Sequence, residues 1–224
     1  MVTPQIGNGP FNLVIEREML FTENLTIDSP VSMYTGQLNV GNITVRTDAA
    51  KTWNPRPDWE TLHARRADIL NQLTQLPIAN YQSTASSLSH ALANRDLSAV
   101  LTTTELLAGL GNGLTPAGDD FIVGSLLATW IIHPTESARV LAEEVASTAG
   151  PLTTSLSAAW LRSAGRGEAG SLWHEFFNAL LLADSVGNQK AMDEILAVGE
   201  TSGADAMAGF IDLFVYWGQH CSNL

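Results

Sequence analysis

The sequence predicts an α+β protein, in which a small antiparallel β-rich N-terminal unit is followed by a larger all-helical domain. Residues 11–52 are rich in Val, Ile, Thr, Asn and Gly, and turn signals separate their short apolar runs. From residue 58 onward, apolar residues recur at helical spacing within Ala- and Leu-rich segments. The chain is therefore expected to divide into a β-rich unit at 1–52 and a helical domain at 53–224.

Two runs in the N-terminal unit have the alternation that is typical of short strands. They are Asn12–Ile15 and Asn42–Val45, and turn signals stand at Ser29–Pro30 and Gly41–Asn42. We therefore expect both runs to contribute strands to an antiparallel sheet.

The segment 53–58 contains two prolines and ends at Asp58, a residue suited to an N-cap. A helix is therefore expected to begin there. Helical periodicity predicts helices at 58–76, 82–94, 96–109, 116–132, 136–149, 152–165, 168–185, 188–198 and 203–219.

Composition excludes several classes of partner. The formal net charge is -12 and the pI is about 4.6, so the protein's field repels nucleic acids and anionic membrane surfaces. The apolar stretch 121–132 is interrupted by polar residues and is shorter than the roughly 20 residues of a membrane span. The chain opens without a charged leader and an apolar core, and Cys221 has no second cysteine to pair with. A cytoplasmic location is expected.

Several familiar chemistries lack their residues. The five histidines include no pair at i, i+4, and one cysteine cannot build a thiolate zinc site. No Gly-x-Ser-x-Gly elbow is present. Structural zinc and this type of serine hydrolase are therefore excluded.

The most unusual segment is Gly-Leu-Gly-Asn-Gly-Leu-Thr-Pro-Ala-Gly-Asp-Asp at 109–120. Its spacing resembles a P-loop, but two aspartates stand where that motif needs Lys and Ser or Thr. The glycines permit positive φ and close approach of a ligand, while Thr115 is suited to an N-cap and Pro116 to the first helical position. The free N–H groups of such a helix start attract anions.

The two aspartates, Asp119 and Asp120, point about 100° apart on a helix. We expect one of them to hold the glycine loop by accepting backbone N–H groups, and the other to face a ligand or a divalent cation. The alternative is a plain helix start stabilised by acidic residues in its first turn.

Two further helix starts are rich in hydroxyl groups. Thr-Thr-Ser-Leu-Ser occupies 153–157, and Gly-Glu-Thr-Ser-Gly-Ala-Asp-Ala-Met-Ala-Gly occupies 199–209. Each alone is compatible with an ordinary cap, but three in one domain indicate helix starts that converge on a polar or anionic ligand. The expected ligand-binding residues are Gly111, Gly113, Thr115, Gly118, Thr153, Thr154, Ser155, Thr201, Ser202 and Gly203, and the expected catalytic residues are Asp119, Asp120 and Asp205.

In these three blocks the chain resembles a bacterial family of unknown function that includes a subunit of oxamate carbamoyltransferase. That enzyme splits oxalurate with phosphate in allantoin breakdown. The likeness runs from about Gly9 onward and includes the stretch Ala50–Pro55. In two respects the chain departs from the family pattern: Glu200 stands where histidine is expected, and a further N-terminal segment is expected ahead of the likeness.

The resemblance implies small anionic substrates: phosphate, carbamoyl phosphate, oxamate or oxalurate. It also implies partners, either other subunits of a transferase complex or further copies of this chain. No Lys, Arg or His lies within the three blocks, so positive charge is expected from a partner or from Mg²⁺ held by Asp119, Asp120 or Asp205. Two alternatives stay open, a non-catalytic metabolite-binding or regulatory subunit and a Mg²⁺-dependent, phosphate-releasing hydrolase.

Overall fold

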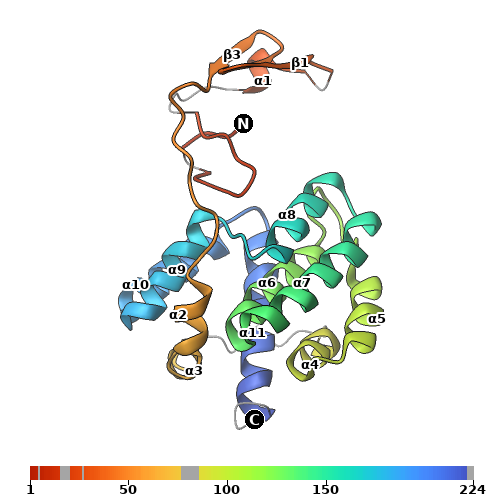
Figure 1. The fold of residues 1–224 in the computed structure, drawn as a ribbon, viewed down its shortest axis with the longest axis vertical. Coiled ribbons are helices and arrows are strands. Elements are labelled where there is room, and N and C mark those ends of the chain that lie inside the picture. Colours follow the sequence, from red (N-terminus) through yellow and green to blue (C-terminus); the bar gives the residue numbers. More distant parts are fainter. Residues whose placement is uncertain (5, 16–20, 27, 77–85, 221–224) are drawn as a thin grey trace. The chain divides into compact units, whose positions relative to one another are not determined.

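The computed structural model describes residues 1–4, 6–15, 21–26, 28–76 and 86–220. It consists of two compact units, Met1–Pro55 and Arg56–Leu224, and each is described by itself (Figure 1). Cys221 and the first residues of the helix predicted at 82–94 lie outside the described residues.

The first unit contains a three-stranded antiparallel sheet. Strands β1 (Val31–Tyr34), β2 (Gln37–Val40) and β3 (Ile43–Arg46) follow one another as a meander, and a short helix, α1 (Phe21–Asn24), precedes them. Gly36, in the first hairpin, adopts a φ of 74°, a conformation that glycine reaches at low cost. The predicted antiparallel sheet is therefore confirmed, and the run 42–45 lies almost entirely within β3.

The strand predicted at Asn12–Ile15 is wrong. This run makes only one isolated parallel bridge, between Val14 and Val2, in which the Val2 N–H donates to Leu13 and the Ile15 N–H donates to Val2. Alternating apolar residues build a strand only where another extended segment lies alongside. Within the described residues, the bridge to Val2 is the only strand-like pairing of this run.

All the regular elements that the structure describes in the second unit are helices. Helix 58–76 of the prediction is divided at Arg65, whereas the other predicted helices are present with shifted ends. No described helix combines the length and the apolarity that crossing a membrane requires. The helices are α2 (Trp59–Ala64), α3 (Arg66–Leu73), α4 (Ser86–Asn94), α5 (Leu97–Leu107), α6 (Ala117–Ile132), α7 (Thr135–Ala149), the 3-10 turn η1 (Gly150–Leu152), α8 (Ser155–Gly165), α9 (Ser171–Leu182), α10 (Ser185–Leu196) and α11 (Ser202–His220). Sheet followed by helices is the predicted α+β arrangement, which is confirmed.

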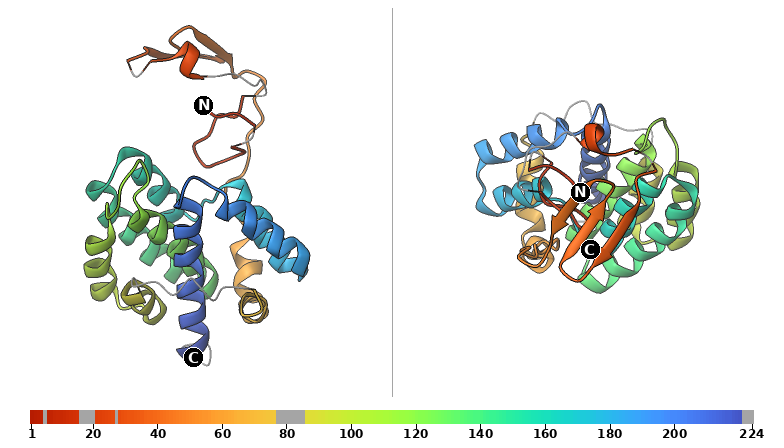
Figure 2. Two further views of the ribbon diagram at one scale, coloured as in Figure 1. Left: turned by 180° about the vertical axis from the view of Figure 1, so that it is seen from behind. Right: turned by 90° about the horizontal axis from the view of Figure 1, so that it is seen from above.

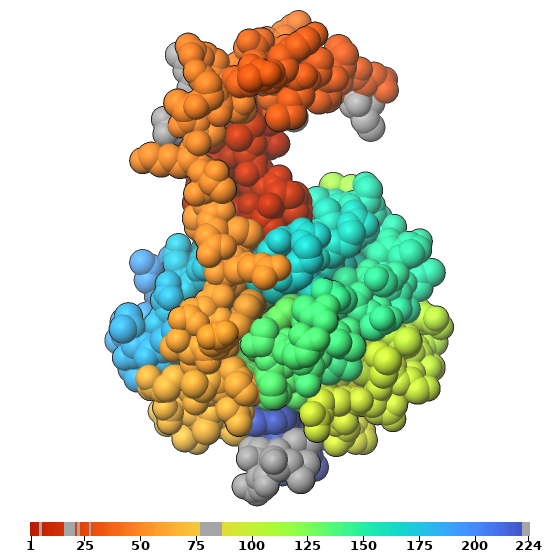
Figure 3. Space-filling view, in the orientation of Figure 1, coloured from red at the N-terminus to blue at the C-terminus, as the bar shows by residue number. Residues whose placement is uncertain are grey.

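Helix α6 forms the centre of the helical unit and packs against α11 (Figures 1 and 2). It is apolar on every side and almost completely buried, as expected for a helix without a polar face. In the space-filling view, α2 and α3 lie on one side of the visible face and α4 and α5 on the other (Figure 3).

The crossing of α6 and α11 brings backbone against backbone. A Cβ added to Gly124 would lie 1.7 Å from the carbonyl oxygen of Ala206, and one added to Gly209 would lie 2.0 Å from that of Phe121. Because these contacts fall within the N-terminal halves of both helices, the crossing also brings the N-terminal ends of α6 and α11 together.

Candidate functional site

The loop between α5 and α6 is built from residues that permit an irregular backbone. Gly109, Gly111 and Gly113 all have positive φ, at 72°, 125° and 99°. A Cβ on Gly111 would lie 2.7 Å from the nitrogen of Ala117, whereas one on Gly113 would meet no atom within 4 Å. The loop is therefore tightly curled near α6 and open at its tip.

The start of α6 differs from the prediction by one residue. Pro116 occupies the N-cap, with φ of -56° and ψ of 143°, and makes no side-chain cap. Thr115, which the sequence suggested as the cap, instead shares a hydrogen bond of 2.7 Å with the hydroxyl of Ser202 in α11. Contact with a distant helix thus replaces local capping.

Asp119 holds the loop to the start of the α8 segment. It is 1% exposed, its Oδ1 accepts the Gly109 N–H at 2.8 Å, and its Oδ2 accepts the hydroxyl of Thr153. This is the loop-holding role that we expected for one of the two aspartates. Both of its oxygens have donors from the protein, which favours this structural role over the catalytic or metal-binding one.

Asp120 occupies a different environment. It is 9% exposed, and its Oδ2 is buried without a partner among the described residues. Burial, with smaller contributions from the charges of Asp205 and Asp119, raises the pKa of Asp120 to about 7, although hydrogen bonds from Ser202 and Thr115 act in the opposite direction. The group is therefore poised to gain or lose a proton near neutral pH.

Asp205, in the first turn of α11, faces the same junction. Its Oδ2 is also buried without a partner among the described residues, and its charge is among the causes that raise the pKa of Asp120. Two carboxyl groups from different helices therefore meet at this point, each with an unsatisfied oxygen.

The third helix start is joined to the loop through Thr154. This residue is the N-cap of α8, where its Oγ1 accepts the Ser157 N–H at 3.1 Å and donates to the carbonyl oxygen of Leu114 at 2.5 Å. The role of the Leu114 carbonyl has no signal in the sequence, because any residue supplies a backbone carbonyl. Ser155, the first residue of α8, is exposed.

Together these hydrogen bonds bring all three sequence blocks into contact. The remaining predicted residues have different positions. Gly118 and Gly203 are buried against backbone: an added Cβ would lie 2.1 Å from the Leu107 carbonyl oxygen and 1.8 Å from that of Ile195. These two glycines serve close packing, which leaves no room for a ligand at their Cα atoms. Thr201 is exposed, and its carbonyl accepts the Asp205 N–H.

The loop tip offers free backbone donors. The N–H groups of Gly111, Asn112 and Gly113 have no hydrogen-bond acceptor among the described residues, and all three residues are exposed. Such N–H groups just ahead of a helix suit an anion or a polarised carbonyl oxygen.

The site offers few side-chain ligands for a metal ion. Among the described residues, no group of three or more His, Cys, Asp or Glu side chains is arranged to hold a metal ion. Asp120 and Asp205 alone offer too few ligands for Mg²⁺, which would need substrate oxygens or water to complete its octahedral shell.

Positive charge is scarce near these carboxyl groups. No ion pair within the described part of the chain involves Asp119, Asp120 or Asp205. Arg162 and Arg166 line a hollow of about 570 Å³ between α7, η1 and α8. Arg166 is paired there with Glu168 at 2.6 Å.

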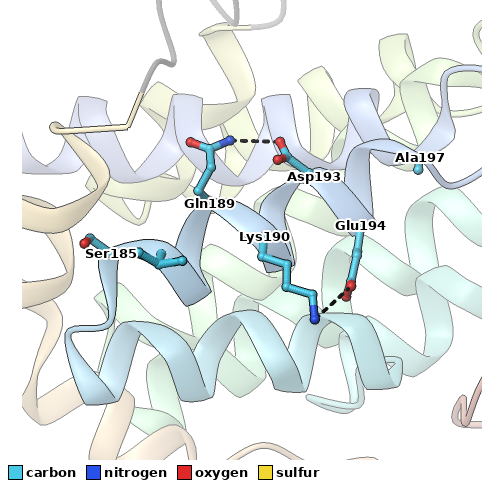
Figure 4. A pocket seen from close by; sticks show the side chains of 7 residues that line it. Ser185, Gln189, Lys190, Asp193, Glu194 and Ala197 are labelled. Atoms are coloured by element: carbon cyan, nitrogen blue, oxygen red, sulfur yellow. Dashed lines mark hydrogen bonds and ion pairs between the residues drawn. The ribbon is translucent and has the colours of Figure 1, made fainter.

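A second hollow, of about 630 Å³, lies along α10 and contains none of the predicted residues (Figure 4). Four of its polar side chains pair with each other: Gln189 donates to Asp193 at 2.8 Å, and Lys190 lies 3.7 Å from Glu194.

The fold and the site define a class: a helical domain in which three helix starts are hydrogen-bonded together around two buried carboxyl groups. Residues 107–214 match the model of a family described as oxamate carbamoyltransferase subunit AllH. This stretch, which contains all three blocks, is therefore similar to that family, as the resemblance in the sequence implied. No solved structure matches the chain.

Proposed function

We propose that this chain is the metabolite-binding subunit of an oxamate carbamoyltransferase or a close relative, and that it holds a small anionic substrate where α6, α8 and α11 begin. The observation that carries the proposal is the buried carboxyl group of Asp120. It stands among the hydroxyl groups of Thr115 in the loop and Ser202 in α11 with an unpaired oxygen, and the same loop has free N–H groups.

The proposed chemistry follows from these groups. In carbamoyl transfer from oxalurate to phosphate, a phosphate oxygen forms a bond to the carbamoyl carbon and the bond from that carbon to the oxamate nitrogen breaks. The leaving nitrogen needs a proton, which a protonated Asp120 with a pKa of about 7 is suited to donate. The phosphate gives up a proton and so restores Asp120.

The loop N–H groups have a complementary role in this proposal. Donors fixed by the fold stabilise the negative charge that develops on the carbamoyl oxygen, without the need for a nucleophilic side chain. Asp119 supports them indirectly, because it fixes Gly109 and thereby the start of the loop.

The test compares two aspartate variants in the assembled enzyme. Carbamoyl phosphate formation from oxalurate and phosphate is measured with the other subunits present. Asp120→Asn is expected to lower kcat by about a hundredfold or more, the usual contribution of a general acid. The matched control is Asp212→Asn, because burial also raises the pKa of Asp212, a half-buried residue of α11 whose pKa is influenced by Ser89 and which lies outside the three blocks.

Other results would favour the alternatives. Wild-type activity in Asp120→Asn would remove this residue from the mechanism. Binding of oxamate or phosphate without any effect of Asp120→Asn on turnover would favour a regulatory subunit. Phosphate release that depends on Mg²⁺ would favour the hydrolase.

A further inference from the structure

Five exposed leucines lie on the chain segments next to the candidate site. We call them the leucine rim: Leu106, Leu110, Leu114, Leu152 and Leu156, which are between 38% and 73% exposed. Single exposed leucines are ordinary on protein surfaces, but a contiguous apolar group is a mark of a protein interface.

The rim residues belong to segments that touch one another. A Cβ on Gly109 would lie 2.5 Å from the carbonyl oxygen of Leu152, so the loop and η1 are in direct contact. The Leu114 carbonyl accepts the Thr154 hydroxyl, two residues before Leu156. The Leu110 carbonyl accepts the N–H of Gly118 in α6 at 2.9 Å. The five leucines are therefore carried by the same backbone segments that build the site.

The site next to the rim contains carboxyl groups that no described cation pairs with. Asp120 and Asp205 each have a buried, unpartnered oxygen, and no described Lys or Arg forms an ion pair with either. An apolar surface next to an unpaired acidic site is complementary to an apolar surface from which a basic side chain projects.

We propose that the leucine rim is the docking face for another subunit of the transferase, and that this subunit places an Arg or Lys beside Asp205. The inference rests on the proposed function for the role of the inserted cation, but the rim and its partner are tested separately. Docking would cover the loop tip, exclude water and bring to the site the positive charge that phosphate chemistry needs.

A second copy of this chain fits the rim less well. Each copy carries a net charge of -12, so two acidic sites brought together would repel each other. The occupant is therefore inferred to be a different, locally basic chain.

The experiment compares two pairs of substitutions in the full chain. Leu106→Ser with Leu152→Ser alters the rim outside the loop tip and the hydroxyl groups. Leu182→Ser with Val186→Ser is the matched control, because these residues are 79% and 78% exposed at the end of α9 and the start of α10. Binding to the other subunits of the same organism's oxamate carbamoyltransferase is measured by calorimetry, and binding of oxamate and of phosphate by the isolated chain is measured in parallel.

The rim variant is expected to bind the other subunits at least about tenfold more weakly than wild type, while the control binds normally. Wild-type binding is also expected to weaken as salt is raised, and to do so less in Asp205→Asn. Thermal melting shows that each variant is folded.

Three results would overturn the proposal: unchanged affinity in the rim variant, absence of any complex between the wild-type subunits, or a rim that holds two copies of this chain together. Failure of the isolated wild-type chain to bind oxamate and phosphate has a different meaning. If the subunits still assemble through the rim, the docking face stands and the metabolite-binding role fails.

Discussion

Two neighbouring aspartates at the start of α6 illustrate how surroundings separate identical side chains. Asp119 accepts hydrogen bonds on both oxygens, from Gly109 and from Thr153. Asp120 is buried with one oxygen unpaired, and its pKa is raised to about 7. One carboxylate is therefore committed to the loop, while the other retains capacity for a proton or a ligand.

The raised pKa of Asp120 predicts a pH-dependent stability. Its pKa in the folded chain lies above the unfolded value of 3.8, so the folded state holds the proton more tightly. Stability from this group is complete below about pH 4 and is lost as pH rises to about 7. Relative to wild type, Asp120→Asn should therefore gain stability between these limits, on the order of 3 kcal/mol.

Urea unfolding of wild type and Asp120→Asn at a series of pH values measures this difference. Taking the difference removes the effect of His133, whose pKa burial lowers to about 4 and which acts in the opposite sense. A difference in unfolding free energy that stays constant from pH 4 to pH 8 would show that Asp120 ionises normally.

Asp119 is predicted to be structural. Asp119→Ala leaves the Gly109 N–H and the Thr153 hydroxyl without their acceptor, and is expected to cost about 2–3 kcal/mol of unfolding free energy. Asp119→Asn keeps one acceptor oxygen and should cost about 1 kcal/mol. Denaturant midpoints decide the point, and equal stability of Asp119→Ala and wild type would contradict the role.

At the scale of elements, the crossing of α6 and α11 depends on missing side chains. Gly124→Ala would place a Cβ 1.7 Å from the Ala206 carbonyl oxygen, so the helices must separate. We expect a loss of about 3 kcal/mol or more.

Gly187→Ala in α10 is the matched control for this substitution. There the nearest atom is the carboxylate of Asp184, the flexible end of an exposed side chain, so the variant should retain or slightly raise stability. Thermal melting of both variants measures the contrast, and equal melting temperatures would show that α6 and α11 are less closely held.

Thr154 joins two elements, since it caps α8 and donates to the loop carbonyl of Leu114. Thr154→Val removes both interactions and should cost about 1–2 kcal/mol, whereas Thr154→Ser retains the hydroxyl and should resemble wild type. Unfolding of the two variants is compared at equal pH. Equal stability of Thr154→Val and Thr154→Ser would show that the link between the loop and α8 contributes nothing to the unfolding free energy.

At the scale of the whole molecule, the acidic character of the chain and the similarity of residues 107–214 to a transferase subunit underlie a prediction about assembly. The three blocks contain no Lys, Arg or His. We therefore expect the purified chain alone to form no carbamoyl phosphate from oxalurate and phosphate, and activity to appear when the other subunits are added. Robust turnover by the isolated, metal-free chain would contradict this expectation.

Local signals in the sequence determined much of the fold. Helical periodicity after Asp58 and the turn residues around 41–42 depend on preferences expressed within a few residues, and the helices and the sheet formed where these signals lie. The two local predictions that were wrong have a common cause, because each depended on which distant segment the residues contact. The run Asn12–Ile15 lacked a partner segment, and Thr115 turned to Ser202 instead of capping its own helix.

The candidate site, like the fold, depends partly on local sequence and partly on tertiary packing. Glycine, proline and hydroxyl residues mark helix starts in the sequence itself, so the three blocks were recognisable as candidates without coordinates. Only the tertiary structure decided which aspartate retains a free oxygen, that Gly118 and Gly203 pack against carbonyls, and that leucines near the site are exposed. Burial and pairing between residues far apart in the chain depend on how α6, α8 and α11 pack, and no short stretch of sequence encodes that packing.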